Sequence, residues 1–178
     1  MKKLLGIALL AILMACNNTA KIPKELNDSI AINSAKSQTS IVVFKDEKLQ
    51  TIFNEYISLK NALVSSKVID AQSAAGILAK NLNTYSGCEN TALIANKIEN
   101  AKDIVVQRKD FTALSSDVIA MFKHADLKTG TIFIQHCPMA NKGEGGDWLA
   151  AEKKIQNPYY GSEMIDCGAV IEEIKTKK

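Results

Sequence analysis

Residues 46–63, with the sequence DEKLQTIFNEYISLKNAL, decide the fold class, because their apolar residues recur at spacings of three and four. That period is typical of a helix that buries one face, and Asp46 is suited to cap its N-terminus. The apolar positions in this stretch are Leu49, Ile52, Phe53, Tyr56, Leu59 and Leu63. Similar spacings predict three further helices, over about residues 71–85, 90–101 and 103–123. Because the connections are short, the sequence predicts an up-and-down four-helix bundle.

The chain beyond the fourth helix has a different character. Residues 131–135, TIFIQ, are β-branched and aromatic and predict a strand, and residues 168–172 predict a second one. Between them, residues 136–168 are rich in glycine and proline and predict an ordered loop region. The expected fold class is therefore all-α, with a small C-terminal loop lobe that contains a short β-hairpin. Pairing of the two strands would bring Cys137 and Cys167 close together.

Composition limits the function of the chain. Its 178 residues, 47% of them hydrophobic, fit a single globular domain, which we assign to residues 44–178. A formal net charge of +3, with no basic stripe, excludes a nucleic-acid partner. No apolar run beyond the N-terminus reaches the roughly 18 residues of a membrane-spanning helix, which excludes a multi-pass membrane protein.

The N-terminus predicts export and a lipid anchor. Residues 1–15 form a signal peptide, with two lysines followed by a short apolar segment. The sequence Leu-Met-Ala-Cys that ends at Cys16 resembles a bacterial lipobox, so Cys16 is the expected lipidation site. Residues 16–43 are then a polar tether to the membrane. We expect a cell-envelope lipoprotein that faces the periplasm or the cell exterior, while a plain secretory signal with a chance cysteine is the alternative.

Two pairs of sulfur residues lie at opposite ends of the 136–168 loop. Cys137 and Met139 form one pair, Met164 and Cys167 form the other, and His136 stands beside the first. Thiolate and thioether ligands select Cu(I) or Ag(I), whereas a zinc site uses cysteine, histidine or carboxylate and no methionine. These five residues are therefore candidate ligands of Cu(I) or Ag(I), the cofactors that the sequence predicts.

The same residues carry a resemblance to a known family. Residues 135–170 contain H-C-P-M-A, W-L, N-P-Y-Y-G and M-x-x-C-G in that order, and residues 107–115 contain Q-R-x-x-F-x-x-L-S. The chain resembles DUF3347 over about residues 44–174, with Ala150 where that family often has serine. DUF3347 domains occur in Bacteroidetes as small lipoproteins and fused to adaptors of heavy-metal efflux pumps. The family has no settled activity, and the resemblance implies copper or silver handling with metal-efflux components as partners.

Two alternatives remain open at the sulfur residues. Cys137 and Cys167 could instead form a structural disulfide, which suits an exported protein. In that case the chain is a disulfide-stapled, metal-free protein-interaction module of the envelope. Met139 and Met164 could fill gaps in the core, the usual role of a single methionine.

The sequence does not predict an enzyme. His136 and Cys137 are adjacent, so in a strand they point to opposite faces and do not form a base and its nucleophile. The chain also lacks the common motifs of serine hydrolases, zinc proteases and phosphate-binding loops.

Overall fold

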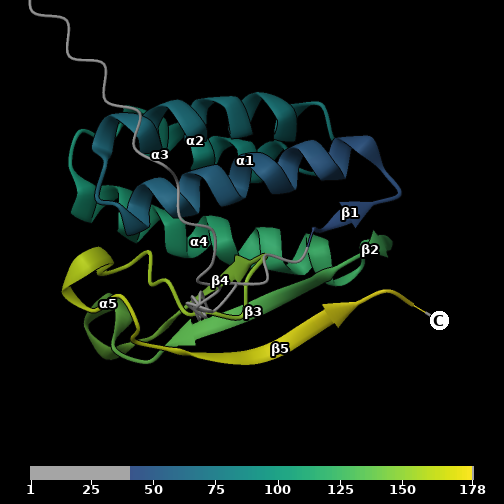
Figure 1. Cartoon of the computed structure of the whole chain (residues 1–178). Coiled ribbons are helices and arrows are strands. Elements are labelled where there is room, and N and C mark those ends of the chain that lie inside the picture. Colours follow the sequence, from purple (N-terminus) through teal and green to yellow (C-terminus); the bar gives the residue numbers. More distant parts are fainter. Residues whose placement is uncertain (1–40, 178) are drawn as a thin grey trace, which may run out of the picture. The chain divides into compact units, whose positions relative to one another are not determined.

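The computed structural model describes residues 41–177, which form helices on one side of a small antiparallel sheet (Figure 1). In chain order the elements are β1 (Val43–Phe44), α1 (Glu47–Val64), α2 (Val68–Asn83), α3 (Glu89–Asn100), α4 (Ile104–Lys123), β2 (Leu127–Thr129), β3 (Thr131–Cys137), α5 (Ala140–Gly143), β4 (Gly146–Ala150), η1 (Gly161–Glu163) and β5 (Ala169–Lys175).

The predicted all-α class is wrong, and the fold is mixed α and β. Two antiparallel sheets are present in the described part of the chain, a small one of β1 and β2 and a larger one in the order β4-β3-β5. The sequence does not indicate strand β4, because Gly145 and Gly146 favour a loop and only Trp148 and Leu149 follow as large apolar residues. Residues on β4 lie opposite residues on β3 in register, for example Leu149 opposite Ile134. Such pairing is decided by contacts across the sheet and leaves little local signal.

The four long helices lie where the sequence predicts helices. Two of them, α1 and α4, begin after an aspartate whose side chain caps the helix N-terminus. The Asp46 carboxylate accepts hydrogen bonds from the backbone amides of the first turn of α1, at 2.8 and 3.3 Å. The Asp103 carboxylate does the same for α4, at 2.7 and 3.2 Å. Each carboxylate satisfies amide groups that have no partner within the helix.

Helices α2 and α3 pack through small residues. The buried face of α2 carries Ala71, Ala74, Ala75, Gly76, Leu78, Ala79 and Leu82. Helix α3 buries Ala92, Ala95 and Ile98, whereas Leu93 is exposed. Alanine faces let two helix axes approach closely, so the larger leucine turns outward although it is more apolar.

The sheet contacts the helices through aromatic and hydroxyl groups. The Tyr56 ring of α1 stacks on Phe111 of α4, and the Tyr56 hydroxyl accepts a hydrogen bond from the Leu149 amide of β4 at 3.2 Å. The hydroxyl group also lies 2.6 Å from that of Ser115 on α4. In Figure 1, β3 and β5 run side by side below α4, and β4 lies between β3 and that helix. Strands β3 and β4 therefore contribute to the main core and do not form a separate lobe.

Several predictions concern residues outside the described range. The signal peptide over 1–15, the lipidation site Cys16 and nearly all of the 16–43 tether lie outside the residues that the structure describes. Of the tether, Val43 belongs to β1 and pairs with Thr129. Among residues 41–177, no helix has the length and apolar character needed to cross a lipid bilayer.

Candidate functional site

The Cys137 and Cys167 thiols meet at the C-terminal end of β3. Their Sγ atoms are 2.9 Å apart, and both residues are free cysteines. Cys137 is the last residue of β3 and is fully buried, whereas Cys167 lies just before β5 and is half-buried. The prediction that strand pairing brings these two residues together is confirmed. This pair of thiols, which we call the thiol pair, is the candidate functional site.

Gly168 lets the chain pass the thiol pair and enter β5. Its φ is +140°, and a Cβ atom there would lie 2.7 Å from the His136 carbonyl oxygen and 3.0 Å from the Trp148 ring. A side chain would therefore push Cys167 away from β3. Glycine avoids both the strained backbone conformation and the clash.

The environment of the thiol pair favours the protonated form of Cys167. The pKa of the Cys167 thiol lies above its ordinary value, first because of its hydrogen bond with Cys137 and then because of burial. A thiol with a raised pKa is a weak nucleophile at neutral pH, since the thiolate is the reactive form. Cys167 is therefore a weaker nucleophile at neutral pH than an ordinary cysteine.

His136 is not part of the thiol pair. It is next to Cys137 in β3, and its Nδ1 lies 2.6 Å from Oδ1 of Asp147, which is opposite it on β4. A Cβ atom on Gly145 would lie 2.7 Å from the His136 ring, so the ring is also enclosed on that side. The alternation of side chains along β3 thus separates the predicted nitrogen ligand from the sulfur atoms.

The two predicted methionine ligands lie on the segments next to the thiols. Met139 follows Cys137 by two residues and is 52% exposed, and its carbonyl oxygen accepts a hydrogen bond from the Tyr160 hydroxyl at 2.6 Å. Met164 is half-buried, and its carbonyl oxygen accepts a hydrogen bond from the Cys167 amide at 3.1 Å. These contacts involve only backbone atoms of the two methionines. That their sulfur atoms face the thiol pair stays a prediction.

No larger cluster of hard or borderline ligands surrounds the thiol pair. Within residues 41–177, no three His, Cys, Asp or Glu side chains come together as a metal-binding group. The remaining described cysteine, Cys88, is buried at the N-cap position of α3, and burial raises the pKa of its thiol.

Two aromatic residues of the C-terminal region, Trp148 and Tyr159, belong to the core. Trp148 is fully buried, and its indole donates a hydrogen bond to the Gln135 side chain at 2.8 Å. The Tyr159 ring contacts those of Trp148 and Phe111, with centroid distances of 6.0 and 5.8 Å. This packing holds the 157–167 segment, which leads to Cys167, against α4.

Two polar side chains anchor the same region to helices α1 and α4. Lys60 on α1 is fully buried, and its ammonium group donates a hydrogen bond to Glu152, just after β4, at 2.6 Å. Arg108 on α4 donates to the Pro158 carbonyl oxygen at 2.9 Å and to that of Leu63 at 3.0 Å. A lysine on a helix would ordinarily indicate a solvent-exposed face, so only the folded structure identifies Lys60 as an anchor.

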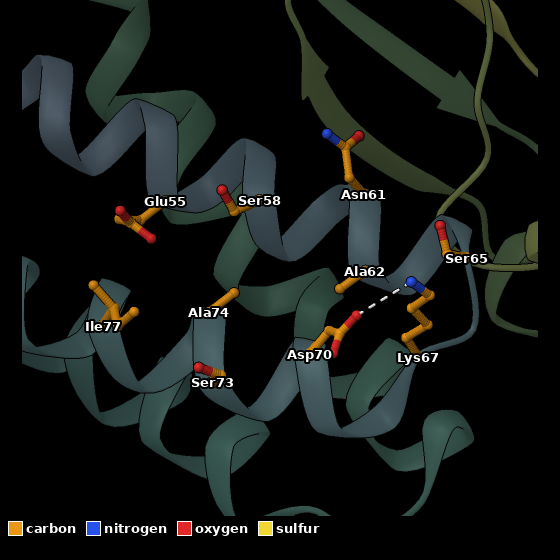
Figure 2. Close-up of a pocket in the computed structure, with 10 residues that line it drawn as sticks. All are labelled: Glu55, Ser58, Asn61, Ala62, Ser65, Lys67, Asp70, Ser73, Ala74 and Ile77. Carbon is orange, nitrogen blue, oxygen red and sulfur yellow. Dashed lines mark ion pairs between the residues drawn. The ribbon is translucent and has the colours of Figure 1, made fainter.

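Two hollows of the described surface lie away from the thiol pair. One of about 560 Å³ lies between α1 and α2, and Figure 2 shows its polar lining with the ion pair of Lys67 and Asp70 at 3.5 Å. A second, of about 630 Å³, lies between the end of α1 and the segment that contains Glu152 and Ile165. Neither hollow is lined by a cysteine, histidine, methionine or aromatic residue, so neither matches the predicted chemistry.

Comparison with known proteins gives one match. The sequence model of a family described as a protein of unknown function, DUF3347, matches residues 52–130, from α1 to the end of the β2–β3 turn. The family predicted from the sequence is thereby confirmed. The match ends before the thiol pair, so it does not test the motif over residues 135–170. No curated protein and no solved structure matches the chain.

Proposed function

We propose, from the premise that this chain belongs to the DUF3347 family through residues 52–130, that it binds one soft metal ion, Cu(I) or Ag(I), at the thiol pair. The observation that carries the proposal is the contact between Cys137 and Cys167, which come from separate parts of the chain and lie 2.9 Å apart. The role is copper or silver handling in the cell envelope, alongside metal-efflux components, and it involves no catalysis.

The ligand set favours a soft monovalent ion. Two sulfur ligands are enough for Cu(I) or Ag(I), which accept low coordination numbers and prefer thiolate and thioether. Zinc needs about four ligands, and residues 41–177 offer no group of three His, Cys, Asp or Glu side chains. Met164, on the same segment as Cys167, and Met139 are the proposed thioether ligands. His136 is left out of the revised set because adjacent side chains of β3 point to opposite faces, which places its ring away from the Cys137 thiol.

Binding requires the two thiols to move apart. With the zinc–sulfur bond length of about 2.3 Å as a guide, two sulfur atoms on one metal ion stand about 3.8–4.6 Å apart for S–metal–S angles of about 110–180°, compared with 2.9 Å here. Cys137 is fixed in β3, so the wider spacing has to come from Cys167, which lies between η1 and β5. Metal uptake also releases protons, since the ligands bind as thiolates.

A second candidate has a specific observation in its favour. A disulfide bond has sulfur atoms about 2.05 Å apart, so closing the thiol pair takes a smaller displacement than opening it for a metal. An exported protein meets an oxidising environment, where such a bond persists. In this alternative the chain is a metal-free interaction module, and the disulfide closes the loop from β3 to β5.

Cu(I) competition titration of the reduced full chain separates the two candidates. We expect uptake of about one Cu(I), abolished in Cys137→Ser and Cys167→Ser and unchanged in Cys88→Ser, the matched control for loss of a buried thiol. Met139→Leu and Met164→Leu should weaken binding without unfolding, because leucine keeps the volume of the side chain. A thiol count on protein taken directly from the envelope shows whether the pair is oxidised there. Absence of copper uptake after reduction, with the pair fully oxidised in the envelope, would favour the disulfide and overturn the metal proposal.

The proposed lipid anchor has its own test. Cys16→Ser should move the protein from the membrane fraction to the soluble envelope fraction, because the acyl chains on Cys16 provide the attachment. Unchanged fractionation, with no lipid mass on the N-terminal peptide, would contradict the anchor while leaving the metal proposal intact.

A further inference from the structure

Asn157 begins the segment that ends with Cys167, and it is fully buried. Its side-chain Nδ2 donates a hydrogen bond to the Cys167 carbonyl oxygen at 2.9 Å. Its backbone amide donates to the Ile165 carbonyl oxygen, also at 2.9 Å. One residue thus connects the beginning of the segment to two points near its end.

The remaining polar atoms of Asn157 organise the start of the segment. Oδ1 accepts hydrogen bonds from the amides of Tyr159 at 2.8 Å and Tyr160 at 3.3 Å, an arrangement typical of an asparagine turn. The backbone oxygen of Asn157 accepts from the Gly161 amide at 3.0 Å. Because these bonds use both ends of the side-chain amide, its orientation is fixed, and Nδ2 must face Cys167.

The two thiols are held in different ways. Cys137 is part of the β3–β4 ladder, where it lies opposite Gly146. Cys167 precedes β5, and the residue pairs of β5 with β3 begin at Ala169. The Arg108 guanidinium anchors the same segment to α4, but through Pro158, nine residues before Cys167 in the chain. The direct side-chain anchor of the Cys167 backbone is therefore Asn157.

We propose that Asn157 is a positioning residue for the thiol pair, acting through its hydrogen bond to the Cys167 carbonyl oxygen. The inference rests on the proposed function because it concerns the same two thiols. With the bond in place, Cys167 stays within reach of Cys137, and both an intramolecular disulfide and a two-thiolate metal site form readily. Without it, Cys167 samples positions away from Cys137 and both reactions are less favourable.

Asn157→Asp tests the inference with the smallest change. The carboxylate keeps an oxygen for the Tyr159 and Tyr160 amides but places a second oxygen, and no donor, against the Cys167 carbonyl group. Asn157→Ser is the uncharged companion, since its hydroxyl can still accept in the turn but is too short to reach Cys167. Asn141→Asp is the matched control, because Asn141 donates in the same way to the Gly145 carbonyl oxygen, at 2.8 Å, in the β3–β4 connection.

The readout is the rate at which diamide oxidises Cys137 and Cys167 of the reduced full chain to a disulfide. This reaction needs no metal. Diamide, a diazene, takes two electrons and two protons from the two thiols and becomes the hydrazine as the S–S bond forms. We expect both Asn157 variants to slow closure about fivefold to tenfold, the ratio that corresponds to one buried hydrogen bond. The Asn141 control should change the rate less than about twofold, and Trp148 fluorescence should show that all variants are folded.

The outcomes separate the inference from the proposed function. Equal closure rates in wild type and Asn157→Ser, or equal slowing in the Asn141 control, would overturn the positioning role whatever the chain does with copper. If Asn157→Asp does not fold, Asn157→Ser decides the matter. Slower closure in the Asn157 variants of a chain that takes up no Cu(I) would support the positioning role and remove the metal proposal.

Discussion

The ion pair between Lys60 and Glu152 offers a prediction about stability. The Lys60 ammonium group is fully buried on α1, and its partner is the Glu152 carboxylate at 2.6 Å, which is only 17% exposed. Glu152→Gln keeps the shape of the side chain but removes the negative charge. The lysine is then left as a buried cation with a neutral partner. Breaking a buried pair in this way costs about 3–5 kcal/mol. Since small domains unfold at a cost of about 5–15 kcal/mol, this one change should remove a large part of the stability.

Replacing the lysine of this pair should reduce the free energy of unfolding less than replacing the glutamate. Lys60→Met fills the same space without a charge, and the Glu152 carboxylate left behind retains some contact with water. We expect a loss of about 1 kcal/mol, and the double variant Lys60→Met/Glu152→Gln should lie within about 1 kcal/mol of wild type. The two single changes are therefore strongly non-additive, as expected for two groups in direct contact.

Urea denaturation followed by the fluorescence of Trp148 measures these free energies of unfolding, because this residue is fully buried in the folded state. The midpoint of unfolding should fall far more in Glu152→Gln than in Lys60→Met. A loss of less than about 1 kcal/mol in Glu152→Gln, or an equal loss in both single variants, would show that the ammonium group reaches water and would refute the reasoning.

Three further predictions concern the core, a helix cap and the thiol pair. Tyr56→Phe keeps the ring but leaves the Leu149 amide and the Ser115 hydroxyl without their partner, so urea denaturation should show a loss of about 1–3 kcal/mol; an unchanged midpoint would contradict the network. Asp103→Ala removes the cap of α4 and should cost about 1 kcal/mol in thermal unfolding, with Asp103→Asn restoring most of it. Because the pKa of Cys167 is raised and the metal binds thiolate, Cu(I) affinity should increase with pH beyond the ordinary pKa of cysteine, and a flat profile in competition titrations would exclude this thiol as a ligand.

The helical part of the fold is predictable from the sequence because its signals are local. Asp46 and the apolar spacing that follows it are enough to place α1, since both operate within a few turns of one helix. Which side of a helix is buried depends on contacts with other helices and is therefore harder to predict from the sequence. The apolar pattern predicts that Leu93 is buried, but the alanines at 92 and 95 allow closer packing, and Leu93 is 60% exposed.

The sheet is only partly predictable because strand pairing is not local. The sequence predicts strands at 131–135 and 168–172, and β3 and β5 do pair, which brings Cys137 next to Cys167. The alternation rule that separates His136 from Cys137 as base and nucleophile applies equally to metal ligands. In the structure, His136 and Cys137 occupy successive positions of β3 and so point to opposite faces of the sheet.

The buried polar residues of the C-terminal region are not predictable from the sequence, and their chemistry explains why. Lys60, Gln135 and Asn157 are polar residues that would ordinarily lie at the surface, yet all three are fully buried. Each acts through a partner elsewhere in the chain: Gln135, for example, donates to the carbonyl oxygen of Glu152 at 2.9 Å. An apolar contact tolerates small shifts, whereas a buried polar group that loses its partner incurs the full cost of desolvation. If Asn157 positions Cys167 as proposed, polar substitution at Asn157 should affect the thiol pair more than volume-conserving apolar substitutions in the same region.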